Sequence, residues 1–167
     1  MGIVLYNTMG RLKQEFKPLE QGVVRMYNCG PTVYSHAHIG NFRAFVFADI
    51  LRRYFKYKGL RVIQVMNITD VGHMTTDADE GEDKMAKAAR IEKKDPWEIA
   101  RFYENSFFED LDALGIERAE HYPRATEHIP EMIALVEKLI KNGHAYEVNG
   151  NVYFDIETFP AYGRLSN

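Results

Sequence analysis

The sequence has 167 residues, of which 46% are hydrophobic and 13% aromatic, and this composition excludes a chain that is disordered throughout. A net charge of −3 excludes a globally positive surface, so a nucleic-acid partner would need a local patch or another part of the protein. No apolar run approaches the roughly 20 residues of a membrane span, and residues 1–11 show no signal peptide. With a single cysteine, the chain fits a reducing, cytoplasmic compartment.

The first half of the chain predicts a strand, a loop, a helix and a second strand. Apolar and β-branched runs mark the strands, helical spacing marks the helix, and Gly59 marks its end. The predicted elements are, in order, a strand or extended arm at Gly2–Asn7, a polar stretch at 11–20, a strand at Val23–Tyr27 covered on both faces, a helix from Phe42 to Tyr54, and a strand at Leu60–Asn67. This order predicts two parallel strands with a right-handed crossover.

The second half predicts helices followed by a hairpin. Residues 69–83 form an acidic loop that feeds a helix near 82–91. Asp95, Pro96 and Glu98 are typical of a helix start, and Trp97 is interpreted as a core residue. This helix is predicted to end at Gly115 and to bury one face, formed by Ile99, Phe102, Tyr103, Phe107, Leu111 and Leu114. A further helix is predicted at 127–142, with an apolar stripe at Ile129, Met132, Ile133, Val136, Leu139 and Ile140. The last predicted element is a hairpin that turns at Asn149-Gly150.

The stretch Cys29–Asn41 joins the predicted strand at 23–27 to the helix that follows, which is where α/β proteins bind phosphate. Imidazole N–H groups of His36 and His38 can donate to phosphate oxygens, Gly40 permits close approach, and the helix start adds free N–H groups. The alternative is that the histidines cap the helix and satisfy loop carbonyls. The residues by themselves leave both interpretations open.

Taken whole, this stretch resembles the first signature of class I aminoacyl-tRNA synthetases, and specifically that of the cysteinyl-tRNA synthetase family. The matching motifs occur in the family's order along nearly the whole chain. They are Tyr6-Asn7-Thr8, Cys29–Tyr34, His38-Ile39-Gly40-Asn41, Asn67–Val71, Pro123–Ile129, Val152–Asp155 and Tyr162–Ser166.

The resemblance implies an α/β fold, namely the first half of a Rossmann-like (HUP-type) nucleotide-binding fold. It places the Rossmann half at about 20–80 and a helical, connective insertion with a terminal β-hairpin at about 81–167. It also implies an enzyme that activates cysteine with ATP and Mg²⁺ to cysteinyl adenylate. The cysteinyl group is then transferred to tRNA(Cys).

The resemblance also assigns roles to single residues of the opening loop. His38 and Asn41 would be catalytic; Thr32, His36, His38, Gly40 and Asn41 would bind ATP; Gly30, Thr32 and Thr69 would bind cysteine; and Cys29 would bind Zn²⁺. Zinc would hold the substrate thiolate, which it prefers to a hydroxyl. Without the resemblance, a lone cysteine is more typical of an inert buried residue.

Several family elements lie beyond this chain, including three further zinc ligands and the second, lysine-rich signature. The zinc site is therefore expected to be incomplete and the isolated chain inactive. Apolar surface along the second strand and the terminal hairpin is expected to be exposed, which favours self-association. Lys84-Met85-Ala86-Lys87-Ala88 resembles the second signature but directly follows the strand–helix–strand unit, so it is interpreted as a solvated helix face.

Other polar residues carry two interpretations each. His73, Asp77 and Asp79 could hold a metal or belong to an exposed acidic loop, and Arg124 and His128 could meet phosphate or cap a helix. Two further functions stay open: a cysteine ligase acting on an amino-sugar thiol precursor, and a non-catalytic nucleotide-binding fragment. Tyr6-Asn7-Thr8 and Pro123–Thr126 favour the synthetase.

Overall fold

The computed structural model describes residues 2–71 and 95–166 of the chain. These residues form two compact units: a larger one, Pro18–Glu127, and a smaller one that combines Met1–Lys17 with His128–Asn167. Several sequence expectations lie outside the described residues, namely the helix near 82–91, Lys84–Ala88, His73, Asp77 and Asp79.

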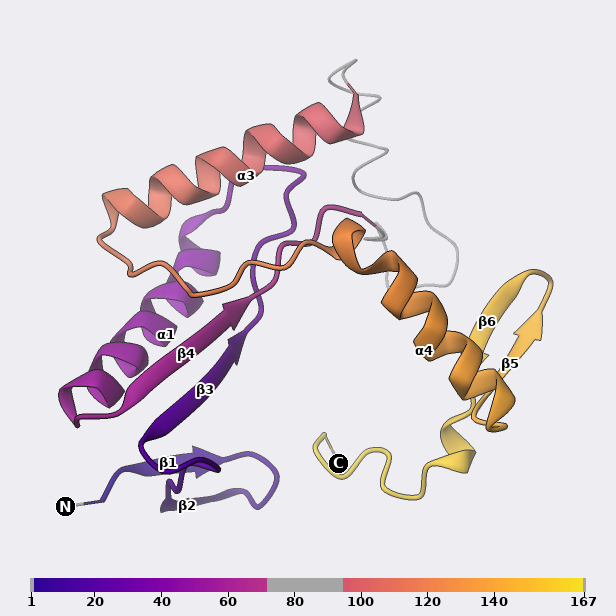
Figure 1. Cartoon of the computed structure of the whole chain (residues 1–167), viewed down its shortest axis with the longest axis horizontal. Coiled ribbons are helices and arrows are strands. Elements are labelled where there is room, and N and C mark those ends of the chain that lie inside the picture. Colours follow the sequence, from indigo (N-terminus) through magenta and orange to yellow (C-terminus); the bar gives the residue numbers. More distant parts are fainter. Residues whose placement is uncertain (1, 72–94, 167) are drawn as a thin grey trace. The chain divides into compact units, whose positions relative to one another are not determined.

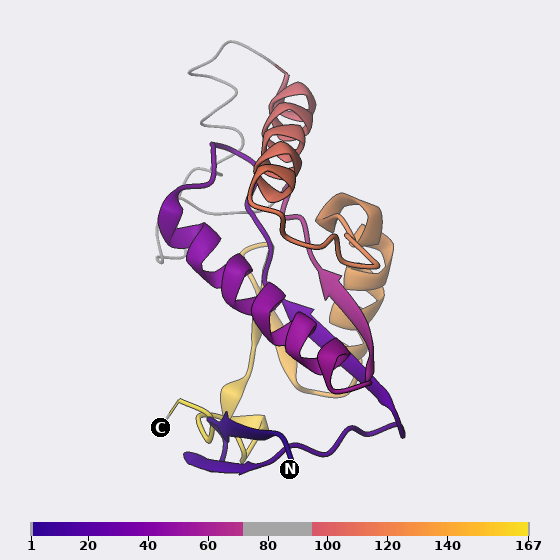
Figure 2. The same cartoon turned by 90° about the vertical axis from the view of Figure 1, so that its left-hand side faces the viewer.

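The larger unit is built on two parallel strands joined by a helix, as the sequence predicted. Strand β3 (Val23–Asn28) pairs with β4 (Arg61–Met66), with Val24 opposite Val62. Helix α1 (Ile39–Tyr57) connects them and lies across one face of the pair (Figures 1 and 2). The expectation that the first strand is covered on both faces is wrong. Of its six residues only Val24 is buried, and Tyr27 is 67% exposed.

The segment from Glu120 to Ala125 runs along the free edge of β4 as an irregular third strand. The N–H of Met66 donates to the carbonyl of His121 at 3.0 Å, and that of Ile68 donates to the carbonyl of Pro123 at 2.8 Å. The bridges in this segment are parallel. The sequence did not predict it, because a polar stretch with a proline lacks the alternation of a strand.

Helix α3 (Pro96–Ala113) closes the core of the larger unit. Its start is the predicted one: the Asp95 side chain accepts a hydrogen bond from the N–H of Trp97 at 2.8 Å, and Pro96 lies in the first turn. The aromatic ring of Phe107 contacts those of Phe42 and Phe45. The core cluster consists of Val33, Phe42, Phe45, Met66, Ile68, Ile99, Ala100, Phe107, Leu111 and Ile116.

Three apolar residues of α3 do not belong to this core. Trp97 is 54% exposed, and Phe102 and Leu114 are exposed to a similar degree, so their assignment to the core is wrong. Trp97 lies in the first turn of the helix and Leu114 is its C-cap residue, whereas the buried residues of the helix lie between Ile99 and Leu111. Helical spacing alone does not tell where that packing ends.

A buried arginine ties α1 to β4 and to the chain that follows α3. Arg52 is 4% exposed, and its guanidinium donates to the side chain of Gln64 at 2.8 Å and to that of Glu120 at 2.7 Å. Glu117 is paired with Arg52 and Lys56. Among the described residues, the buried Nε of Arg52 has no hydrogen bond but lies 3.2 Å from the carboxylate of Glu117. Because a buried charge has to be paired, these ion pairs hold the helix on the strand pair.

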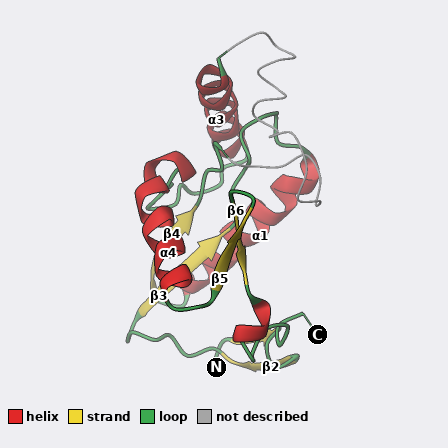
Figure 3. Cartoon of the chain, turned by 90° about the vertical axis from the view of Figure 1, so that its right-hand side faces the viewer, coloured by secondary structure: helices red, strands yellow, loops and turns green. Residues whose placement is uncertain are grey.

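The smaller unit contains two antiparallel hairpins and a helix. Strands β1 (Val4–Asn7) and β2 (Leu12–Glu15) form the first hairpin, whose second strand the sequence did not predict. A 3₁₀ turn, η1 (Ala125–His128), leads into helix α4 (Ile129–Lys141), which contacts β5. Strands β5 (Ala145–Val148) and β6 (Asn151–Phe154) pair across the predicted turn, and η2 (Ile156–Thr158) follows (Figure 3).

The turn between β5 and β6 has the predicted chemistry, since Asn149 and Gly150 both have positive φ. The predicted apolar stripe lies on α4 and is largely exposed. None of its residues is buried, and Ile133 is 54% exposed. Among the helices described, none is long and apolar enough to cross a membrane.

Candidate functional site

The pairing of β3 with β4 continues into the loop that follows β3. The N–H of Val33 donates to the carbonyl of Thr69 at 3.1 Å, and the N–H of Thr69 donates to the carbonyl of Pro31 at 3.0 Å. Thr32 and Thr69 therefore stand side by side in a parallel bridge. This register brings together two residues that are far apart in the sequence and that the resemblance places in one pocket.

Gly30 is required by the close approach of the two chains. A Cβ atom at this position would lie 1.8 Å from the carbonyl oxygen of Asn67. The N–H of Gly30 donates to Oδ1 of Asn67 at 3.0 Å, and Nδ2 of Asn67 donates to the hydroxyl oxygen of Thr69 at 3.0 Å. Asn67 thus orients the Thr69 hydroxyl. The motif Asn67–Val71 is visible in the sequence, but nothing in it marks this role of Asn67.

His38 is the N-cap of α1 and forms a capping box with Asn41. Its Nδ1 atom accepts from the N–H of Gly40 at 2.9 Å, and the side-chain oxygen of Asn41 accepts from the N–H of His38 at 3.0 Å. A neutral imidazole that accepts at Nδ1 carries its proton on Nε2. The cap therefore leaves an N–H donor on the exposed side of the ring, and the two interpretations of this histidine are compatible.

Gly40 is matched to this cap, because a Cβ there would lie 2.7 Å from Cε1 of His38. The second histidine of the loop is held differently. Nδ1 of His36 lies 2.8 Å from the hydroxyl of Ser106 on α3, and its ring meets that of Tyr103 edge to face at 4.9 Å. Nothing in the sequence pattern marked Ser106, since contacts between distant segments leave no local signal.

These residues enclose a polar cavity of about 270 Å³. It gathers five of the predicted site residues, Gly30, Thr32, His36, His38 and Asn41, and its lining is completed by Pro31, Tyr34, Ser35 and Ala37. Two further predicted residues contact this lining without being part of it. Thr69 is bridged to Thr32, and the N–H of Gly40 donates to the ring of His38. The arrangement offers imidazole, amide and hydroxyl groups to an anion at the start of a helix.

Cys29 lies at the end of β3 and does not line this cavity. It is exposed, so the interpretation as an inert buried residue is wrong. Among residues 2–71 and 95–166, no group of three or more histidine, cysteine, aspartate or glutamate side chains could hold a metal ion. Zinc needs four ligands in a structural site, so the described residues do not fit zinc by themselves.

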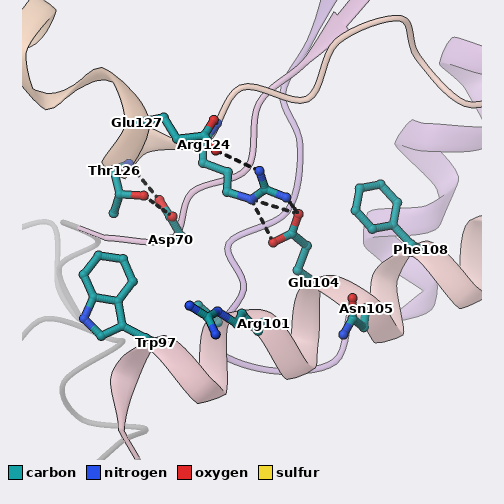
Figure 4. Close-up of a pocket in the computed structure, with 10 residues that line it drawn as sticks. Asp70, Trp97, Arg101, Glu104, Asn105, Phe108, Arg124, Thr126 and Glu127 are labelled. Atoms are coloured by element: carbon teal, nitrogen blue, oxygen red, sulfur yellow. Dashed lines mark hydrogen bonds and ion pairs between the residues drawn. The ribbon is translucent and has the colours of Figure 1, made fainter.

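A second cavity, of about 470 Å³, lies between α3 and the segment that follows Arg124 (Figure 4). The carboxylate of Asp70 accepts from the N–H of Thr126 at 3.0 Å and from its hydroxyl at 2.5 Å. The guanidinium of Arg124 binds Glu104 at 2.6 Å and Glu127 at 2.9 Å, and these hydrogen bonds raise the pKa of Arg124 above its ordinary value.

Arg124, His128 and Trp97, which were singled out in the sequence, have different environments. Arg124 is held by two carboxylates, so its charge is compensated within the chain. His128 is the N-cap of α4 but makes no side-chain cap bond; it lies 3.9 Å from Glu131. Trp97 lines the cavity instead of the core.

Comparison with known proteins gives one matching family and many curated relatives. The family described as "tRNA synthetases class I (C) catalytic domain" matches residues 15–167. The chain is similar to proteins named "Cysteine--tRNA ligase": it is 59% identical to that of Chlorobium luteolum over 99% of the chain and 34% of the relative. It is 52% identical to that of Treponema denticola over 100% of the chain and 34% of the relative. It is 53% identical to that of Deinococcus radiodurans over 98% of the chain and 33% of the relative. The chain spans about a third of the length of these relatives.

Proposed function

The chain belongs to the family of class I (C) tRNA synthetase catalytic domains, and on this premise we propose that it supplies one part of the active site of a cysteine–tRNA ligase. The reaction would begin when a carboxylate oxygen of cysteine attacks the α-phosphorus of ATP. Pyrophosphate leaves and cysteinyl adenylate forms. A ribose hydroxyl at the end of tRNA(Cys) then attacks the activated carbonyl, and AMP leaves.

The capping box at the start of α1 is the observation that carries the ATP part of this proposal. The Nε2–H of His38 is free to donate to a phosphate oxygen because Nδ1 is occupied by Gly40. Asn41 holds the backbone of that histidine, and the helix start adds a positive potential. Such a site stabilises spread negative charge and positions the reactants, so no protein nucleophile is required.

The wall formed by Gly30, Thr32 and Thr69 is proposed to bind the amino acid. Asn67 donates to the hydroxyl oxygen of Thr69, so the proton of that hydroxyl is available to a substrate acceptor. Cys29 directly precedes Gly30 in the sequence, and its side chain is exposed. We propose it as one zinc ligand, with the other ligands outside the described residues. Mg²⁺ is expected to arrive with the ATP phosphates.

The finer architecture belongs to the same proposal. We place a Rossmann-like half at about 20–80 and a connective insertion at about 81–167, which the parallel pair of β3 and β4 supports. A cytoplasmic location is supported by the free, exposed thiol of Cys29. The names of the curated relatives favour transfer to tRNA over the amino-sugar alternative and over a non-catalytic fragment.

Cysteine-dependent exchange of pyrophosphate into ATP tests this function. An enzyme that contains this chain together with the remaining two thirds of the length of its relatives is expected to catalyse the exchange. Replacing His38 by alanine should lower its rate by about a hundredfold, a typical loss for one charge-stabilising donor. Exchange that is independent of cysteine, or unaffected by this substitution, would contradict the proposal.

A further inference from the structure

One face of α3 presents three side chains that have no hydrogen-bond or ion-pair partner among residues 2–71 and 95–166. Trp97, Arg101 and Asn105 follow one another at intervals of four residues, so they lie in a row on the helix. All three are exposed and line the cavity of about 470 Å³. Within the described residues, none of their side chains has a hydrogen bond or an ion pair. Figure 4 shows Trp97 and Arg101 on the side of α3 that faces Asp70 and Thr126.

The opposite wall of this cavity is already satisfied. Asp70 is 8% exposed, and its carboxylate accepts both the N–H and the hydroxyl of Thr126. Arg124 is held between Glu104 and Glu127. The wall is thus a fixed, acidic surface, whereas the row on α3 supplies an exposed aromatic face, an arginine without an ion pair in the part of the chain that the structure describes, and one amide.

We propose that this cavity binds a ribonucleotide, with the base stacked on Trp97 and the phosphate on Arg101. Aromatic faces hold bases without regard to sequence, and an arginine fork is well suited to phosphate oxygens. The amide of Asn105 carries both donor and acceptor groups and can meet a base edge. A pocket of this volume falls within the range that holds small ligands.

The acidic wall makes ribose a better fit than deoxyribose. Counting Asp70, Glu104 and Glu127 against Arg101 and Arg124, three carboxylates face two guanidinium groups. A phosphate is therefore expected on the Arg101 side only. From the described residues, the carboxylate of Asp70 accepts two hydrogen bonds, both from Thr126. A carboxylate can accept about four, so a ribose hydroxyl can still donate to it, as ribose hydroxyls do to carboxylates in dinucleotide-binding folds. A 2′-hydroxyl distinguishes RNA from DNA.

This cavity is separate from the proposed ATP site, since the two share no lining residue. The ribonucleotide can come from a free nucleotide or from a single-stranded RNA end. Only the RNA source rests on the proposed function, because the curated relatives are named as tRNA ligases. The chemistry of the site is the same for both.

The chain offers a direct probe, because Trp97 is its single tryptophan. Tryptophan fluorescence of the chain is to be titrated with adenosine 5′-monophosphate, with a short single-stranded RNA, and with the DNA of the same sequence. Stacking of a base on Trp97 quenches this fluorescence, so the ribonucleotides are expected to quench it in a saturable way. The DNA should bind several-fold more weakly than the RNA.

Two variants make the assignment specific. Arg101→Gln is expected to weaken binding about tenfold, the loss typical of one charge-assisted hydrogen bond. Arg43→Gln, which alters an exposed arginine on α1, should leave binding unchanged. Circular dichroism checks that both variants are folded.

The outcomes separate this inference from the proposed function. If the RNA quenches the fluorescence and the free nucleotide does not, the ligand of the cavity is an RNA end. If both quench equally per nucleotide, the ligand is a free nucleotide. Absence of saturable quenching by either ligand, or an Arg101→Gln variant that binds as tightly as the parent chain, overturns the proposal. A His38→Ala variant should retain the quenching even where ATP binding is lost.

Discussion

The Nδ1 atom of His38 lies 2.9 Å from the backbone nitrogen of Gly40, whose N–H donates to it. One contact therefore performs two tasks. It satisfies a free N–H group at the start of α1, and it forces the imidazole proton onto Nε2. Helix capping follows from this geometry, and the proposed binding of phosphate depends on the same contact.

The two tasks of His38 can be separated by mutation. His38→Ala removes the cap and should lower the free energy of unfolding by about 1 kcal/mol. His38→Asn retains a good N-cap and should lower the free energy of unfolding by only about a few tenths of a kcal/mol. Both variants lose the Nε2–H donor and should lose ATP binding alike. Urea unfolding and isothermal titration with ATP measure the two effects. If His38→Asn bound ATP normally, the imidazole would have no role in phosphate binding.

Gly30 should tolerate no side chain. In Gly30→Ala the new Cβ would collide with the carbonyl of Asn67, from which it would lie 1.8 Å. Because backbone must move to relieve this clash, we expect a loss of about 1–3 kcal/mol of stability. Gly10→Ala is the matched control, since its nearest contact would be an ordinary 3.5 Å, and it should change stability by less than about 0.5 kcal/mol. Equal stability of the two variants would refute the close approach.

Glu117 should contribute to the acid sensitivity of the fold. Its hydrogen bond from Lys56 outweighs burial and lowers the pKa of the carboxyl below its ordinary value of 4.5. The unfolded chain therefore binds more protons near this pH, and stability rises with pH. The contribution is complete above 4.5 and is lost as the pH falls through the lower, folded pKa.

Glu117→Gln is accordingly expected to flatten the fall in stability on acidification, and to cost less than about 1 kcal/mol at neutral pH because the pair is partly solvated. Chemical unfolding at a series of pH values measures both quantities. Glu109→Gln, which changes an exposed carboxylate of α3, should keep the parent's dependence on pH. An unchanged slope in Glu117→Gln would show that the Lys56 contact is absent in solution.

The apolar face of α4 predicts self-association of the isolated chain. Ile129, Met132, Ile133, Val136 and Ile140 recur at helical spacing and are each at least 36% exposed. Contiguous apolar surface of this kind is rarely left in water. Sedimentation should show a mass that increases with concentration, and Ile133→Lys should reduce the effect. A monomer at every concentration in both proteins would speak against this surface as an interface.

The elements that the sequence predicted well are those with a local signature. Asp95 and Pro96 mark a helix start by their own chemistry, and Asn149-Gly150 marks a hairpin because both residues adopt positive φ. The parallel pairing of β3 and β4 follows from the length of the connection between them. The helix start and the hairpin turn depended on neighbouring residues only, and the parallel pairing depended on the order and length of the elements.

The failures have a common physical cause, which is that burial depends on distant partners. Trp97 has the spacing of a core residue, yet the cavity beside Asp70 and Thr126 leaves it half exposed. The third strand along β4 is made by backbone bonds to a polar segment. Ser106 reaches His36 across seventy positions of the sequence. The family motif identified the loop of the site, but not the residues that support it.

The central proposal is that residues 32–41 bind ATP, with the phosphates at His38, and a titration of amide chemical shifts with ATP tests it most directly. In the isolated chain, ATP should shift the amides of Thr32, His36, His38, Gly40 and Asn41 in a saturable way, and His38→Asn should abolish these shifts. Absence of any shift at millimolar ATP, or shifts confined to other parts of the chain, would contradict it.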